Sequence, residues 1–204
     1  MRIPSVKGVL FAADVEDVQK LLAEGLISHA ELERRLDAAA LQSLERPVAP
    51  ASWYDIRIAK QLVELLADVE GVNKEKFLID RGARNAERMF EVGLYQQLDY
   101  LQRSKSRQAT DAAAKVVAYG RDLKLLATLS AACFNFTKWS VRPDPHHESR
   151  FVIDVRDALD FPDVHCWCTL GYMNWMAVRH HGGDMWKWRR ETTDHVVFTM
   201  TRDP

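Results

Sequence analysis

The sequence predicts an α+β protein: a helical N-terminal two-thirds packed on a small antiparallel sheet, with a C-terminal helix and hairpin. Apolar residues recur with helical spacing from about residue 14 to residue 129, whereas from residue 134 onward two short segments alternate apolar and polar residues. The last quarter then reads as an apolar helix followed by two more alternating strands. We expect residues 1–204 to form a single domain, because this length suits one well-filled core and is short for two.

The C-terminal segment shows the clearest pattern. The helix expected over residues 164–181 is apolar around nearly its whole circumference, so more than one side of it must be covered. A Gly-Gly pair ends this helix, and strands over 185–189 and 195–200 follow. Because Trp186 and Trp188 fall on one face of the first strand, the two strands predict a half-buried hairpin.

Five helices are expected before residue 130, at residues 14–24, 29–44, 53–70, 73–101 and 110–129. Asp14, Ser28 and Ser52 are the expected caps at the starts of the first three. Gly82 and Gly93 cost stability inside the fourth helix, so we expect each to mark a close approach by another helix or by the sheet.

Two further strands are expected between the fifth helix and the C-terminal segment. Residues 134–139 and 151–156 both alternate, and residues 143–148 contain the turn signals expected of the loop between them. Gly120, in the preceding helix, is interpreted as a bend. The helices and strands are thus segregated along the chain, which is typical of an α+β fold with an antiparallel sheet.

Short motifs are spread over nearly the whole chain. They are Val6–Lys7–Gly8, Pro50–Ala51–Ser52–Trp53–Tyr54, Arg81–Gly82–Ala83, Phe161–Pro162, Cys166, Gly171 and the final hairpin. With these motifs the chain resembles a myxobacterial-type family related to the four-vinyl-reductase domain. The resemblance implies the fold that this domain shares with haem-nitric-oxide-associated and TRAPP transport-subunit domains. It also implies a homodimer, because relatives of this fold pair through helical surfaces.

Two departures from these relatives bear on cofactors. The cysteine pair near the end of four-vinyl-reductase domains is replaced here by Trp188 and Val196, which removes the thiolates that a metal or redox role needs. The Tyr-x-Ser-x-Arg motif, with which the haem-binding relatives hold haem propionates, is absent. We therefore expect no metal and no cofactor.

Histidines and cysteines elsewhere offer a weaker metal hypothesis. The run His165–Cys166–Trp167–Cys168 looks like a metal knuckle, but two cysteines separated by one helical residue point to different faces. Small core residues are the plainer interpretation of these cysteines. The pairs His146–His147 and His180–His181 could supply imidazole ligands, although a loop and a helix end more simply leave them solvated.

An aromatic set leaves three interpretations open. Its members are Trp139, Tyr172, Trp175, Trp186 and Trp188. They suit an apolar ligand pocket, a subunit interface or simple core packing. Lys187, Arg189 and Arg190 lie beside the tryptophans, but we expect a solvated face rather than a nucleic-acid site, because the net charge is −1.

Composition limits the setting in which the protein works. Three cysteines without framework spacing indicate reduced thiols, and no segment has the length of a membrane span or the form of a signal peptide. The expected location is therefore the cytoplasm, with no membrane contact.

No catalytic motif is recognisable in the sequence, so we expect a protein that is not an enzyme. The leading hypothesis is a protein-binding or scaffold module in cytoplasmic signalling or organisation. It would act as a homodimer or assembly subunit through the helix at 73–101, with Gly82 and Gly93 at the shared surface. The alternative is a sensor that encloses a small apolar ligand, and the third is a metalloprotein or enzyme that uses His and Cys.

Overall fold

The computed structural model describes residues 3–91, 111–181 and 183–204. Its helices are α1 (Gly8–Ala23), α2 (His29–Arg35), α3 (Ala38–Leu44), α4 (Ile56–Glu70), α5 (Lys74–Glu91), α7 (Ala112–Cys133) and α8 (Asp163–His181). Its strands are β1 (Ser5–Lys7), β2 (Trp53–Asp55), β3 (Lys138–Asp144), β4 (His147–Arg156), β5 (Trp186–Thr192) and β6 (His195–Met200).

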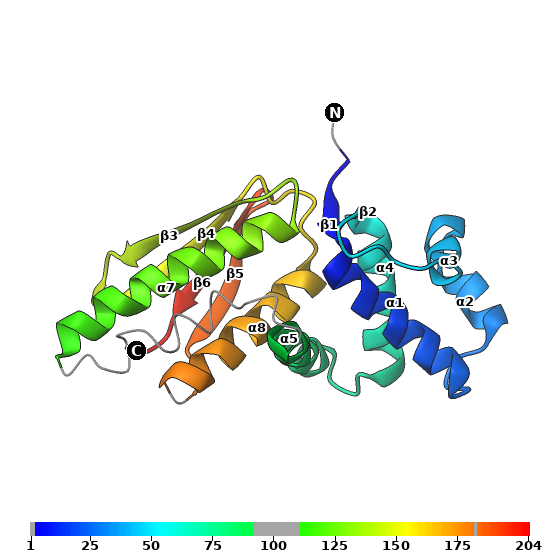
Figure 1. The fold of residues 1–204 in the computed structure, drawn as a ribbon, viewed down its shortest axis with the longest axis horizontal. Coiled ribbons are helices and arrows are strands. Elements are labelled where there is room, and N and C mark those ends of the chain that lie inside the picture. Colours follow the sequence, from blue (N-terminus) through cyan, green and yellow to red (C-terminus); the bar gives the residue numbers. More distant parts are fainter. Residues whose placement is uncertain (1–2, 92–110, 182) are drawn as a thin grey trace.

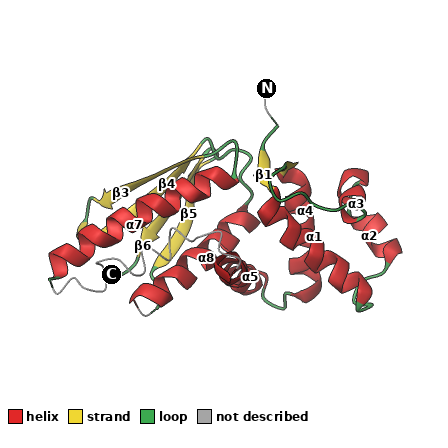
Figure 2. Ribbon diagram, viewed as in Figure 1, coloured by secondary structure: helices red, strands yellow, loops and turns green. Residues whose placement is uncertain are grey.

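The molecule has a helical half and a sheet half. Figure 1 shows α1 to α4 gathered at one end, the larger sheet at the other, and α5 and α8 between them. The name helical half is used here for α1 to α5 with β1 and β2, and the name sheet half for α7, α8 and the four-stranded sheet. That sheet has four antiparallel strands in the order β3-β4-β6-β5, and β1 pairs with β2 in a second, two-stranded sheet. Helices and strands are coloured separately in Figure 2, where α7 runs alongside the four-stranded sheet. The fold is therefore α+β, as the sequence predicts.

The C-terminal helix and hairpin follow their sequence pattern closely. Helix α8 begins one residue before its expected start, and β5 and β6 pair in the register Trp186–Met200 and Trp188–Phe198. Trp186 is buried and Trp188 packs against the core, whereas Lys187 between them is exposed.

The first helix begins six residues earlier than expected. Its first amide groups are held by a distant segment, because Gly8 N–H donates to Ser52 O (2.9 Å) and Val9 N–H donates to Pro50 O (3.1 Å). Asp14 is therefore not the cap of α1 but a buried residue in its interior.

The helix expected over residues 29–44 is two helices. Leu36 is extended and ends α2, and Asp37 then caps α3 by accepting from Ala40 N–H (2.8 Å). This break buries Leu36 in the core. Each short helix still has a capped start, with Ser28 before α2 and Asp37 before α3.

The helix expected from Trp53 begins three residues later. Residues 53–55 pair with β1 as strand β2, and Asp55, rather than Ser52, caps α4 by accepting from Arg57 N–H (2.9 Å). Gly71 ends α4 as expected.

The strand expected at 134–139 is displaced. Phe134 forms only an isolated bridge with Val6, and β3 begins at Lys138. The ring of Phe134 instead packs edge-on against Phe161, with centroids 5.0 Å apart. The expected loop at 143–148 is correspondingly shorter, since β3 and β4 extend into it.

Two glycines let α5 and α8 cross in close contact. A Cβ at Gly82 would lie 1.9 Å from the carbonyl oxygen of Cys168, and one at Gly171 would lie 1.9 Å from that of Ile79. The close approach expected at Gly82 thus occurs within the chain. Because α8 covers this face of α5, the structure gives no support to a homodimer formed through it. Gly93 lies outside the described residues.

Candidate ligand cavity between the two halves

A cavity of about 90 Å³, here called the central cavity, lies where the two halves meet. Helices α1, α4 and α5 line it from the helical half, and α7, β3 and α8 line it from the sheet half. Its residues are Leu10, Asp14, Val63, Arg81, Gly82, Asn85, Met89, Ser130, Cys133, Phe134, Trp139, His165, Cys168, Thr169 and Tyr172. The lining is mostly apolar with a few polar side chains, which is typical of small-molecule sites.

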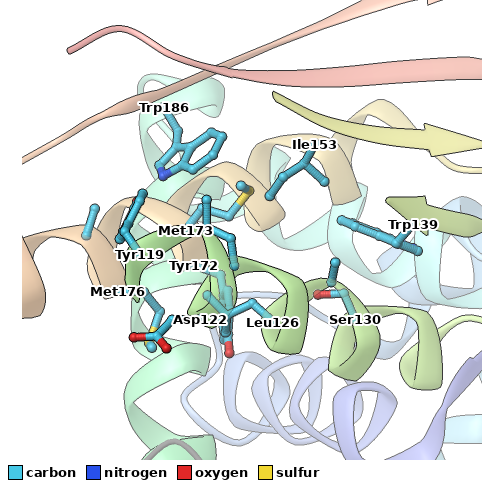
Figure 3. A pocket seen from close by; sticks show the side chains of 13 residues that line it. Tyr119, Asp122, Leu126, Ser130, Trp139, Ile153, Tyr172, Met173, Met176 and Trp186 are labelled. Atoms are coloured by element: carbon cyan, nitrogen blue, oxygen red, sulfur yellow. The ribbon is translucent and has the colours of Figure 1, made fainter. Parts of the chain in front are cut away.

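A second cavity of about 40 Å³, here called the sheet cavity, adjoins the first. In Figure 3 its walls are side chains of α7 and α8, with Trp186 and Ile153 from the sheet above them. Ser130, Trp139 and Tyr172 line both cavities, so these three residues form the boundary between them.

An outer hollow of about 280 Å³ lies between α1 and α5. It shares Leu10, Asn85 and Met89 with the central cavity and also contains the charged residues Glu16 and Arg88. The outer hollow therefore borders the central cavity along α1 and α5.

Charged groups are buried at the α1–α5 wall of the central cavity. Arg81 on α5 is only 2% exposed and donates to Asp14 on α1 (2.7 Å) and to Asp17. Arg88 lies 3.5 Å from the other oxygen of Asp17. Burial raises the pKa of Asp14 to about 6 even though Arg81 opposes that shift. Burial disfavours the charge of Arg81 too, but its two carboxylate partners outweigh that effect and raise its pKa.

Two polar atoms beside this cavity lack partners. Nδ1 of His165 and Nε of Arg81 are buried, and neither forms a hydrogen bond with any group that the structure describes. Burial, assisted by the nearby charge of Arg81, lowers the pKa of His165 to about 4, so its imidazole is neutral at pH 7. Buried polar groups without partners are rare, and each calls for an explanation such as a bound molecule.

The three cysteines are free and, in the described ranges, are not grouped with other metal-ligating side chains. Burial raises the pKa of Cys133 to about 11 and that of Cys168 to about 12, so both are thiols at neutral pH. Cys166 is not among the lining residues of the central cavity, although Cys168 is. Within the described ranges, no group of three or more His, Cys, Asp or Glu side chains is arranged to hold a metal ion.

The residues that the sequence singles out fall in different places. Trp139 and Tyr172 line both cavities, Trp186 lines the sheet cavity, and Gly82 lines the central one. Trp175 instead packs edge-on against Phe90, with centroids 6.0 Å apart.

The surface histidines and basic residues lie away from the cavities. His147 is exposed, and its Nδ1 lies 3.4 Å from Oδ2 of Asp144 at the β3–β4 turn. Arg189 pairs with Glu191, and Arg190 holds Asp163 (2.7 Å) together with three backbone carbonyl oxygens. The side chains of His180 and His181 lie outside the described part of the structure.

Six polar residues that line the central cavity were not assigned to a ligand site from the sequence: Asp14, Arg81, Asn85, Ser130, His165 and Thr169. Asp14 and Arg81 occupy positions on the apolar stripes of their helices, between Phe11 and Val18 on α1 and after Leu78 on α5. A charged residue within such a stripe is a signal that could have identified the pair.

Comparisons with known proteins show similarity in structure alone. No protein-family model and no curated protein sequence matches the chain. The H-NOX protein from K. algicida in its Fe(II) unliganded form has a TM-score of 0.57 at 14% identity, with 97% of each chain covered. An H-NOX protein from S. oneidensis in the Fe(II)NO ligation state has a TM-score of 0.52 at 13% identity, covering 95% of this chain and 97% of that one. A mutant of T. tengcongensis H-NOX has a TM-score of 0.53 at 9% identity, covering 97% and 98%.

These comparisons correct the resemblance drawn from the sequence. The solved structures that this chain resembles are H-NOX domains, not four-vinyl-reductase or TRAPP-like domains, so that assignment is wrong. The resemblance rested on motifs of a few residues each, and such short stretches do not specify one fold. The comparisons also give no support to a scaffold role. None of the helices in the described part combines the length and apolar character needed to cross a lipid bilayer.

Proposed function

We propose that this chain is a non-catalytic sensor domain that encloses a small, largely apolar ligand between its helical half and its sheet half. One observation carries the proposal: the central cavity is lined by α1, α4 and α5 on one side and by α7, β3 and α8 on the other. A ligand held there contacts both halves at once, so its binding energy depends on how the halves are positioned. Reduced thiols at all three described cysteines suit a cytoplasmic sensor.

The structural neighbours support a sensor more than a scaffold. They are H-NOX proteins described with Fe(II), with Fe(II)NO and with distorted haem. Small-ligand binding at the same kind of fold is therefore the function that we carry over, and the nature of the ligand has to be decided from this chain's own residues.

Haem does not fit the volumes of the central and sheet cavities. Cavities that bury even drug-sized ligands span roughly 300–1,000 Å³, whereas the central cavity has about 90 Å³ and the sheet cavity about 40 Å³. Haem iron is held by His, Cys, Met or Tyr. Residues of these types do line the central cavity, so haem is excluded there by volume alone. The outer hollow, which is larger at about 280 Å³, has Met89 as its one lining residue of these types and is also bordered by Glu16, Arg88 and Glu91. The proposed ligand is accordingly smaller than a porphyrin.

Binding of a small apolar probe tests this function. We expect benzene to shift the indole NMR signal of Trp139, because this ring borders both cavities. The variant Ser130→Leu adds an apolar side chain at the boundary between the cavities and should weaken binding at least tenfold. Thr128→Leu is the matched control, because Thr128 is exposed on the same helix.

Haemin addition gives the second readout. We expect no stoichiometric haem complex and no displacement of benzene by haemin. One haem bound per chain with a sharp Soret band, or benzene binding that Ser130→Leu and Thr128→Leu affect equally, would contradict the proposal.

A further inference from the structure

We propose that the ligand of the central cavity is a neutral molecule of about five heavy atoms that carries hydrogen-bonding groups, held by Arg81 and His165. This names the ligand class of the same cavity, so it rests on the proposed function. The two side chains approach the cavity from opposite halves, Arg81 from α5 and His165 from α8.

The unpartnered polar atoms define what the ligand must offer. Nε of Arg81 is a donor and requires an acceptor. Nδ1 of His165 requires an acceptor or a donor, depending on the tautomer of the neutral ring. A purely apolar ligand would leave both atoms unsatisfied, which is unfavourable in a buried site. A ligand with an acceptor beside a donor would satisfy both.

The charges around Arg81 exclude an ion. Two carboxylates, Asp14 and Asp17, face two guanidinium groups, Arg81 and Arg88, so this cluster has no net charge to offer an anion or a cation. The remaining lining includes apolar groups such as Val63, Met89 and Phe134. A buried ion would have no counter-charge in such surroundings, whereas a neutral molecule needs none.

The volume limits the size of the ligand. An apolar cavity of roughly 150 Å³ accepts benzene, with six heavy atoms. The central cavity is smaller at about 90 Å³, but it adjoins the sheet cavity across Tyr172 and Trp139, so small shifts of these side chains would enlarge it. A five-membered heterocycle or a short-chain amide is the size class that fits, and benzene, with one heavy atom more, requires these side-chain shifts.

Pyrazole and cyclopentane are the probes that test this ligand class. Both are five-membered rings, but pyrazole presents a neighbouring donor and acceptor and is neutral near pH 7. We expect wild-type protein to bind pyrazole about tenfold more tightly than cyclopentane, since one net hydrogen bond is worth about that ratio. Acetate and methylammonium, as an anion and a cation of small size, should bind more weakly than pyrazole.

The variant His165→Phe identifies the residue that makes the difference. It keeps a buried ring but removes both ring nitrogens, so pyrazole binding should weaken about tenfold while cyclopentane binding is retained. His146→Phe is the control, because His146 is exposed at the β3–β4 turn. In wild-type protein, pyrazole should also shift the ¹⁵N signals of the His165 ring.

Each other outcome decides against the ligand class. If cyclopentane binds as tightly as pyrazole, the two polar atoms are satisfied by ordered water only, and the proposed sensor function survives without this inference. If acetate or methylammonium binds best, the ligand is an ion. If no probe binds, both the ligand class and the proposed function fail. The comparison of the two probes in wild-type protein holds even if His165→Phe does not fold.

Discussion

Burial changes the protonation of two cavity residues in ways that oppose each other as the pH falls. The pKa of His165 is lowered to about 4, so its neutral form stabilises the folded state and this contribution is lost as the pH falls from about 6.5 to 4. The pKa of Asp14 is raised to about 6, so its protonated form is favoured in the folded state and its contribution is lost as the pH rises through 6. In the wild type the two effects partly cancel between pH 4 and 6.

Removing His165 should therefore unmask the effect of Asp14. As the pH falls from 6.5 to 4, the free energy of unfolding of His165→Phe should rise by roughly 3 kcal/mol relative to that of the wild type. The reason is that the variant has no buried imidazole that must be kept neutral. Urea denaturation at several pH values measures this. A difference between the two proteins that stays constant over this window would show that His165 titrates normally.

For single residues, the sequence predicts the positions of aromatic side chains better than those of buried polar side chains. Trp186 and Trp188 were assigned to the inner face of β5 because alternation is a local pattern. The role of Arg81 depends on Asp14 and Asp17, which lie more than sixty residues away in the chain. Spacing within one helix cannot reveal a partner on another helix.

At the scale of elements, the α5–α8 crossing is the most sensitive contact to a small change. Gly82→Ala should lower the free energy of unfolding by about 3 kcal/mol, because its Cβ would overlap the backbone of Cys168, which cannot move as a side chain can. Glu87→Ala, exposed on the same helix, is the control and should have little effect. Urea midpoints that are equal for the two variants would mean that the helices separate at little cost.

The final hairpin offers a second test at this scale. Trp188→Asp should lower the free energy of unfolding by more than ~2 kcal/mol, since Trp188 packs edge-on against Trp167 with centroids 5.2 Å apart. Lys187→Asp, on the exposed face of the same strand, should change it little. A similar loss of stability in both variants would mean that Trp188 does not lie on the face of β5 that packs against the core.

The elements that the sequence predicts well are those whose ends are set locally. Helix α8 and the β5–β6 hairpin have their stop and alternation signals within their own residues. The start of α1 depends instead on Ser52 and Pro50, and that of α4 depends on the pairing of β2 with β1. Both starts were predicted wrongly because their amide partners are remote in sequence.

In the whole molecule, the proposed ligand site is a cavity shared by two halves that the sequence does not place relative to each other. Helical and strand periodicity predict an α+β protein, but not that α5 from one half crosses α8 from the other at Gly82 and Gly171. That crossing brings His165 and Arg81 to one cavity. The site is therefore a product of tertiary packing rather than of any single motif.

A crystal pressurised with xenon shows whether the fold encloses a small ligand, because xenon occupies dry apolar cavities without requiring a particular functional group. We expect xenon density beside Tyr172 and Trp139, at the boundary of the central and sheet cavities, and its loss in Ser130→Leu. Xenon found only at the surface, with the space around Tyr172 and Trp139 closed, would contradict the claim that this fold encloses a small ligand between its halves.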